Sequence, residues 1–188
     1  KESQGESLSE VEKAFKDETF GLDEEIKNEN KDFRNFFQSF DIKEDRDTEF
    51  IDLKLDDDNN ILVSNIEINA EDGTSSSFLV NFSDSASDKI FINSQILVNL
   101  KADSKVKLVV VVNLSDKSTN LNSIATRLAD RAELDISYIE IGAEKSMVNI
   151  RNILRGEEAK VIENGVYFKS EEEYLDLMAV NEHYGNKT

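Results

Sequence analysis

The segment that most constrains the fold is the apolar run from Lys105 to Leu114, which contains four consecutive valines. β-Branched side chains are stiff about χ1 and are favoured on the pleated surface of a strand. The run is too short for a buried helix or a membrane span, and its continuous apolar character is typical of a strand that is buried on both faces. We therefore predict a buried strand at this position.

Similar apolar segments recur along the chain, beginning at Phe78, Val106, Leu134 and Val161. Their spacing of roughly 27 or 28 residues is in the range of repeat architectures. A second series of predicted strands falls between them, at 95–100, 122–128, 147–154 and 174–180. Each repeat therefore contains two strands and two turns. One repeat cannot bury its own apolar face but stacked repeats can, so the pattern predicts a solenoid of strands, a parallel β-helix.

Short strands at regular spacing are also typical of an antiparallel β-sandwich, and the pattern alone leaves this alternative open. The two all-β architectures differ in strand direction. Neighbouring strands run parallel in a solenoid, whereas they run in opposite directions within the two facing layers of a sandwich. Before the repeats, 50–55 and 61–68 are predicted strands joined by an acidic turn, forming a hairpin or the first coil.

Residues 1–45 are predicted to form a helical segment and a linker, and residues 46–188 the β-helix. Ser7 and Glu10 have the spacing of a capping box, which predicts a short helix ending before Gly21. Asp23 is predicted to cap a second helix. Its apolar stripe is expected to pack on the strands or, alternatively, to bind a partner. That stripe contains Leu22, Ile26, Phe33 and Phe37, with Phe36 and Phe40 beside it.

The charge of the chain excludes several classes of partner. Forty acidic residues against 22 basic ones give a net charge of −18, so the surface repels nucleic acid and anionic lipid. No apolar run reaches the roughly 18 residues that a membrane helix needs. The chain has no cysteine, which removes disulfides and thiolate metal ligands and is consistent with a cytoplasmic location.

Three sets of polar residues are candidates for a functional site. Asp56, Asp58, Asn60 and Glu67 occupy positions 1, 3, 5 and 12 of a calcium-loop pattern, but Ile61 stands where that pattern needs glycine. An acidic turn in solvent is therefore the preferred interpretation. The single histidine, His183, lies near Asp176 and Glu182 in sequence, and a surface or packing role is favoured over acid–base catalysis.

Asp135, Glu140 and Glu163 are candidates for a pair of carboxylates across stacked strands, as in carbohydrate-cleaving β-helices. Solvated strand faces explain them equally well. No glycine loop for phosphate binding is present, and Gly156-Glu-Glu-Ala-Lys160 is predicted to be a coil turn. Neither catalytic nor metal-binding residues are assigned from the sequence.

A specific order of short motifs occurs in the second half of the chain. Ala129–Leu134 and Ile139–Gly142 are followed by a Leu-x-Gly-x-x-Ala turn, a Gly-x-Tyr strand, Leu175-Asp176 and a loop from His183 to Thr188. The turn and the strand are Leu154–Ala159 and Gly165–Tyr167. From about residue 95 to 188 this order resembles the SufB/SufD family of iron–sulfur cluster assembly scaffold proteins, and in particular its SufD-like members.

The resemblance implies a right-handed parallel β-helix between helical terminal segments, and a non-enzymatic scaffold role. It implies a SufB-like subunit and a SufC-like ATPase as partners, with the iron–sulfur cluster in the full complex. The cluster-associated Cys and His positions of the family lie beyond the matching region, so the chain is expected to be an N-terminal fragment with a truncated β-helix. His183 does not match the cluster-associated histidine.

A truncated β-helix exposes unpaired coil edges and an apolar end, which predicts that the fragment forms a homodimer or aggregates. The alternative functions are a carbohydrate-active β-helix enzyme and an acidic surface binding module with the β-sandwich fold.

Overall fold

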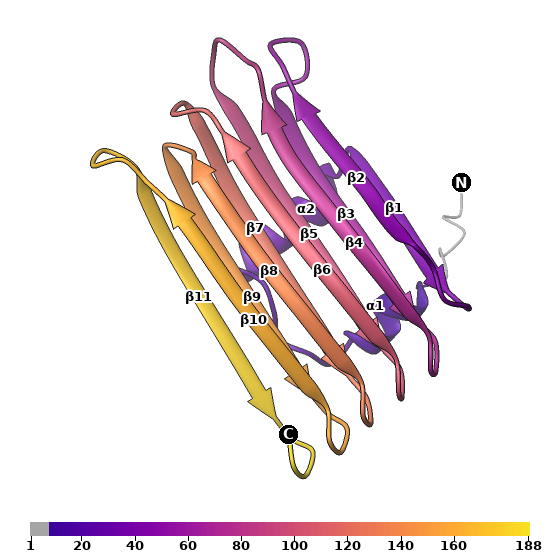
Figure 1. Cartoon of the computed structure of the whole chain (residues 1–188). Coiled ribbons are helices and arrows are strands. Elements are labelled where there is room, and N and C mark those ends of the chain that lie inside the picture. The colour runs from indigo at the N-terminus through magenta and orange to yellow at the C-terminus, as the bar shows by residue number, and fades with distance from the viewer. Residues whose placement is uncertain (1–7) are drawn as a thin grey trace, which may run out of the picture.

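The computed structural model describes residues 8–188, which form two short helices followed by two parallel β-sheets (Figure 1). The six-stranded sheet has the order β1-β3-β5-β7-β9-β11, and the five-stranded sheet the order β10-β8-β6-β4-β2. Strands of the first sheet are β1 (Phe36–Ile42), β3 (Ile61–Ala70), β5 (Ile90–Leu100), β7 (Ser118–Leu128), β9 (Lys145–Leu154) and β11 (Tyr174–His183). Strands of the second are β2 (Thr48–Leu55), β4 (Ser75–Asp84), β6 (Lys105–Leu114), β8 (Glu133–Gly142) and β10 (Lys160–Phe168).

The chain passes alternately from one sheet to the other, and every neighbouring pair of strands is parallel. This arrangement confirms the predicted parallel β-helix and shows that the β-sandwich alternative is wrong. β2 and β3 lie in different sheets, so they belong to a coil and do not form a hairpin. The coils are not equally long. Leu134 pairs with Val106 as the period predicts, whereas Phe78 pairs with Leu108, because the turn after β4 is longer.

The core lies between the two sheets and is filled by every second residue of each strand. In β6 the buried residues are Val106, Leu108, Val110 and Val112, while the residues between them face outward. Phe78 and Phe82 of β4 are among the largest fully buried side chains. Burying one such side chain contributes about 1.5–3 kcal/mol, so the stacked inner columns are the main stabilising feature of the fold.

Helix α1 (Glu10–Ala14) begins at Ser9, which forms the capping box with Glu12. The predicted cap at Ser7 lies outside the described residues, and Glu10 is a first-turn residue of the helix. Phe15 and Phe20 meet edge to face at a centroid distance of 5.4 Å. Together with Val11 they pack on Leu97, Ala125 and Ile153, so this segment covers part of the outer face of the six-stranded sheet.

Helix α2 (Glu24–Phe33) is capped by Asp23 as predicted, but it ends at Phe33, before the other three phenylalanines of the segment. Phe36 to Ile42 form β1, so the predicted extension of the helical stripe to Phe37, with Phe36 and Phe40 beside it, is wrong. Alternate residues face the core here, and Phe40 stacks edge to face on Phe78 at 5.2 Å. Pairing with β3 satisfies the backbone along the whole segment, and this long-range ladder outweighs the helical spacing of the phenylalanines.

No helix among residues 8–188 is long and apolar enough to span a membrane.

Candidate functional site

A polar cluster lies inside the solenoid where β8 ends. The inner column of β8 continues from Leu134 and Ile136 to Tyr138 and Glu140, and both polar side chains are fully buried. Lys169, in the turn after β10, reaches back so that its Nζ lies 2.6 Å from Oε1 of Glu140. We call Asn120, Tyr138, Glu140, Ser146 and Lys169 the polar core cluster.

Hydrogen bonds connect the members of the polar core cluster. The Tyr138 hydroxyl donates to Oε2 of Glu140 at 2.9 Å, and Nδ2 of Asn120 donates to the Tyr138 oxygen at 3.2 Å. Lys169 also donates to Oγ of Ser146 at 3.2 Å and to the carbonyl oxygen of Gly142. The cluster therefore ties three consecutive coils together, because its residues come from β7, β8, β9 and the turn after β10.

Burial fixes the protonation of Tyr138. Desolvation raises the pKa of its hydroxyl well above the usual value, and the neighbouring charge of Glu140 raises it further. The phenol is therefore a permanent hydrogen-bond donor and not a general base. Since Tyr138 and Glu140 have no exposure to solvent, a substrate could not reach them in this arrangement. The cluster can position coils, but it does not form an accessible catalytic site.

A second polar group lies on the inner face nearer the end of the solenoid. Asn152 accepts a hydrogen bond from Thr126 Oγ1 at 2.7 Å and donates from Nδ2 to Asn181 at 2.8 Å and to Glu163 at 2.9 Å. Burial raises the pKa of Glu163, and the hydrogen bond from Asn152 partly offsets this effect. These contacts link β7, β9, β10 and β11 across both sheets.

The candidate carboxylates are too far apart, or face the wrong way, to act as a glycosidase pair. Glu163 pairs with Ile136 in the strand register, four residues before Glu140. Four residues of strand correspond to roughly 13 Å, whereas glycosidase carboxyl groups lie about 5–9.5 Å apart. Asp135 precedes Ile136 and therefore points to the opposite face of the sheet. The structure does not bring these three residues together.

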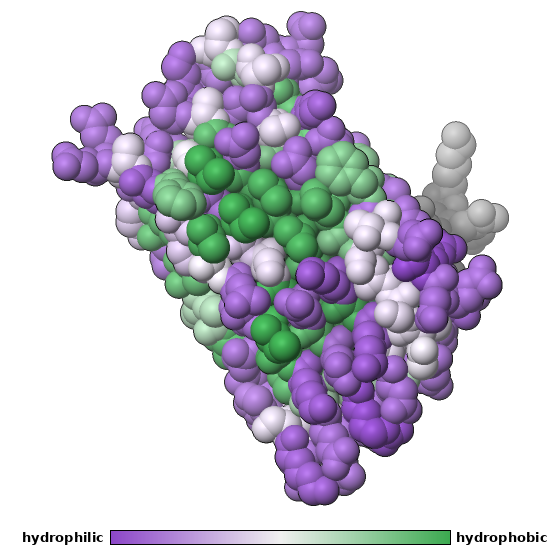
Figure 2. Space-filling view, in the orientation of Figure 1, coloured by the Kyte–Doolittle hydropathy of each residue, from purple (hydrophilic) through white to green (hydrophobic). Residues whose placement is uncertain are grey.

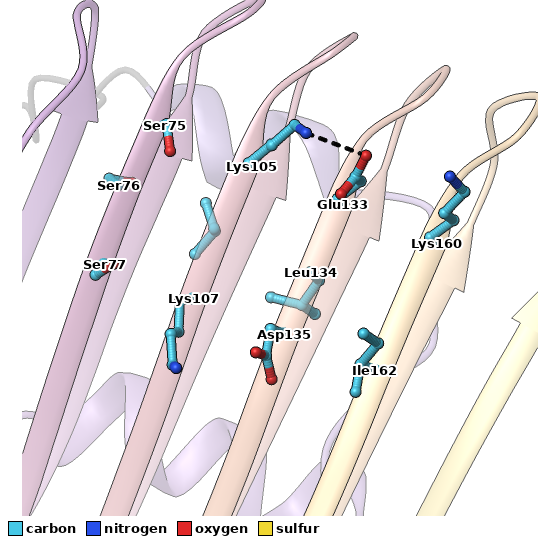
Figure 3. Close-up of a pocket in the computed structure, with 11 residues that line it drawn as sticks. Ser75, Ser76, Ser77, Lys105, Lys107, Glu133, Leu134, Asp135, Lys160 and Ile162 are labelled. Atoms are coloured by element: carbon cyan, nitrogen blue, oxygen red, sulfur yellow. Dashed lines mark ion pairs between the residues drawn. The ribbon is translucent and has the colours of Figure 1, made fainter.

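Asp135 instead lines a shallow hollow on the outer face of the five-stranded sheet, about 240 Å³ in volume (Figure 3). Apart from Ser76, which is a buried residue of β4, its polar residues come from the first two outward positions of successive strands. Lys105 pairs with Glu133 at 3.3 Å, and Lys107 and Lys160 lie nearby (Figure 3). The hollow contains charges of both signs and no histidine, so its composition indicates a solvated strand face.

His183 is exposed at the end of β11, where its Nδ1 lies 3.0 Å from Oγ1 of Thr188. Asp176 lies on the opposite face of the same strand, because seven residues separate the two. Glu182 accepts hydrogen bonds from Arg151 and from the Tyr184 hydroxyl. No catalytic arrangement therefore forms around His183.

The calcium-loop pattern is not a loop in the structure. Oδ1 of Asp56 accepts hydrogen bonds from the backbone of Asp58 and Asn59, which makes an ordinary acidic turn. Glu67 lies far along β3, buried on the outer face of the six-stranded sheet. Throughout residues 8–188, no three His, Cys, Asp or Glu side chains are grouped so that they could hold a metal ion.

Sequence reasoning missed Tyr138 and Lys169. A signal for Tyr138 was present, because it interrupts the otherwise apolar inner positions Leu134 and Ile136 at a spacing of two. Lys169 gave no comparable signal, since it lies in a turn among charged residues. Only the stacking of the last coil brings its ammonium group to Glu140.

Glu67 provides a test of buried charge away from the polar core cluster. Its Oε1 accepts from Nδ2 of Asn65 at 3.1 Å, while the side-chain oxygen Oδ1 of Asn65 has no hydrogen-bond partner among the described residues. We expect Glu67→Gln to stabilise the protein at pH 7 by about 1 kcal/mol, since the new amide can donate to Asn65. Urea unfolding of the two proteins measures the difference.

The pH dependence of this difference has a defined sign. Burial raises the pKa of Glu67, a hydrogen bond from the Ser9 side chain opposes this effect, and the charge of Glu12 adds to it. A raised carboxyl pKa contributes stability at low pH that is lost as the pH rises through the folded-state pKa. The advantage of Glu67→Gln should therefore be largest at neutral pH, shrink as the pH falls through the raised pKa of Glu67, and be smallest once the pH is below the usual range of a glutamate. An advantage that grows on acidification would contradict the burial argument.

The geometry thus defines a class: an acidic parallel β-solenoid whose polar interior connects its coils. A family model described as SUF system FeS cluster assembly, SufBD core domain, matches residues 53–188. The chain belongs to this family, as the motif order from residue 95 onward predicted, and the family has a role in iron–sulfur cluster assembly. Searches of curated proteins and of solved structures gave no significant match.

Proposed function

We propose that this chain is a SufD-like scaffold subunit of a SUF iron–sulfur cluster assembly complex, acting in the cytoplasm and without enzymatic activity of its own. The observation that carries the proposal is the match of the SufBD core domain over 53–188, which covers nearly all of the solenoid. In this role the cluster is cargo of the complex. The chain contributes a rigid stack of coils.

The composition of the segment supports a scaffold role over a ligand role. The chain has no cysteine and a single histidine, so it lacks the thiolates that hold iron–sulfur clusters in proteins. His183 is exposed, and its Nδ1 lies within hydrogen-bond distance of Oγ1 of Thr188. In the proposed complex, cluster ligands come from a SufB-like subunit and nucleotide hydrolysis from a SufC-like ATPase.

Co-purification tests the proposal. The intact protein should be produced together with the SufB-like and SufC-like proteins of the same source, with an affinity tag on the SufC-like ATPase. We expect this chain to be retained in a stable complex at micromolar concentration and to sediment with it. An acidic parallel β-helix protein of another family serves as the control. Failure of this chain to associate with either partner would contradict the scaffold proposal.

The carbohydrate-active alternative has lost its structural support, because Asp135 faces away from Glu163 and Glu140 is inaccessible. Cleavage of a polysaccharide by the protein, abolished in Glu163→Ala, would be needed to restore it. The acidic surface module was tied to the β-sandwich, which the parallel strand order replaces.

A further inference from the structure

The outer face of the five-stranded sheet carries an apolar patch that no described segment covers. Val109 and Val111 of β6, Ile139 and Ile141 of β8, and Val166 and Phe168 of β10 point outward, and Phe168 is 62 % exposed. The strand register places Val111, Ile139 and Val166 side by side, with Ile141 beside Phe168. Figure 2 shows apolar side chains gathered on this face. These six residues are the apolar patch.

The two outer faces of the solenoid differ in a way that the chain itself explains. Parallel sheets are normally covered on both faces. On the six-stranded sheet, α1 and the segment after it bury Leu97, Ala125 and Ile153. Within residues 8–188, no helix contacts the five-stranded sheet to an equal extent. The helical segment therefore covers apolar residues on the outer face of the six-stranded sheet, whereas those on the outer face of the five-stranded sheet remain open.

An acidic edge borders the apolar patch. All strands of the five-stranded sheet end at this edge, because they are parallel, and the turns that follow them carry most of its charge. Lys169, one of the few lysines there, is already held by Glu140. We call these carboxylates the acidic turn edge: Asp56–Asp58, Asp88, Asp116, Glu144 and Glu171–Glu173.

The size of the patch decides between two occupants. Three strands at about 4.8 Å and three outward rows at about 7 Å give a surface roughly 10 by 14 Å. A stable dimer buries about 800 Å² from each partner, so a second copy gains too little here. Two chains of net charge −18 also repel each other. An α-helix that crosses the three strands spans their 10 Å in about two turns, and its diameter of about 10 Å lies within the 14 Å of the outward rows, so it fits the patch.

We propose that the apolar patch and the acidic turn edge together form a docking surface for an amphipathic α-helix of a partner protein, with lysine or arginine residues flanking its apolar stripe. The apolar stripe of that helix packs across β6, β8 and β10. Its basic flank lies against the acidic turn edge, where opposite charges raise the association rate and fix the orientation. The proposal does not depend on the identity of the assembly partners.

A designed peptide provides the first test. The probe is a fluorescein-labelled 18-residue helix with leucines on one face and lysines on the other, measured by fluorescence anisotropy. We expect micromolar binding that weakens as salt is added, and at least tenfold weaker binding of two controls. One control has the same composition with the leucines scattered around the helix. The other has glutamate in place of lysine. Equal binding of the scattered peptide would overturn the apolar part of the proposal.

Matched variants locate the site. Ile141→Ser/Phe168→Ser should weaken peptide binding at least fivefold, whereas Ile61→Ser/Phe33→Ser should not, although Ile61 and Phe33 are also exposed, at 58 % and 70 %. Asp116→Lys/Glu144→Lys should weaken binding more than Glu25→Lys/Glu29→Lys, which changes the net charge equally on the side of α2. Indistinguishable effects within either pair would overturn the proposal.

Sedimentation velocity of the unbound protein tests the competing occupant. We expect that the protein does not dimerise through this face. A dimer that dissociates when Ile141→Ser/Phe168→Ser is introduced would overturn the proposal in favour of a second copy. Asp116→Lys/Glu144→Lys changes exposed turn residues only. Its effect on peptide binding therefore still tests the proposal if Ile141→Ser/Phe168→Ser unfolds. Circular dichroism and the melting temperature establish folding for each variant.

Discussion

Lys169→Met should destabilise the protein by about 3–5 kcal/mol, measured as the free energy of unfolding in urea at pH 7. Glu140 is fully buried, and Lys169 is the cationic group that forms an ion pair with it, at 2.6 Å. Removing the ammonium leaves an uncompensated carboxylate inside the solenoid. The Tyr138 hydroxyl and Asn120 remain as neutral donors, but they do not neutralise a charge.

A double-mutant cycle separates the buried charge from the lost methylenes of Lys169. Glu140→Gln/Lys169→Met removes both charges, so we expect it to recover most of the stability that Lys169→Met loses. Lys187→Met is the matched control, because its ion pair with Glu158 is exposed at 3.1 Å and should cost little. If Lys169→Met and the double variant lose the same free energy of unfolding, the Glu140–Lys169 ion pair does not hold the last coil in place.

Gly156→Val should also be strongly destabilising, by about 3 kcal/mol. A Cβ atom at Gly156 would lie 2.0 Å from the backbone nitrogen of Asp130 and 2.1 Å from the carbonyl carbon of Ala129. Both atoms belong to the turn of the preceding coil. Since the contact is with backbone and not with a flexible side chain, the two coils must separate, and the ladder on either side weakens.

Gly73 gives the control for this prediction. It has a φ of +70° with nothing within 4 Å of an added Cβ, so Gly73→Val tests backbone strain without a clash. We expect a cost of about 1–2 kcal/mol there, clearly below that of Gly156→Val. Thermal unfolding followed by circular dichroism compares the two. A smaller loss at Gly156 would mean that neighbouring coils can shift apart more easily than the close backbone contact indicates.

The repeat was predictable because burial in a stacked strand imposes a local pattern. The valines of β6 and the apolar segments starting at Leu134 and Val161 became strands at the predicted positions. The phenylalanines at 36, 37 and 40 were not predictable in the same way. Their spacing fits a helix as well as a strand, and only the free edge of β3 decides between the two.

The candidate site was less predictable than the fold. The sequence indicates Glu140 as a candidate carboxylate but not its partner Lys169, since 29 residues and one turn of the solenoid separate the two. Glu163 and Asp135 were grouped by residue type, although register and side-chain alternation place them on different faces. Grouping residues into a site on stacked strands requires the strand register, because a shift of one residue moves every side chain to the opposite face of the sheet.

The sequence alone determined the class of fold and the family, because the recurring apolar segments and the motif order from residue 95 are properties of the linear chain. Only the tertiary structure decided which polar residues meet. The contacts of Glu140 with Lys169, and of α1 with one outer face but not the other, join residues that are distant in sequence. The length of each coil and the register of its strands determine these contacts, and both depend on small differences in the lengths of the turns.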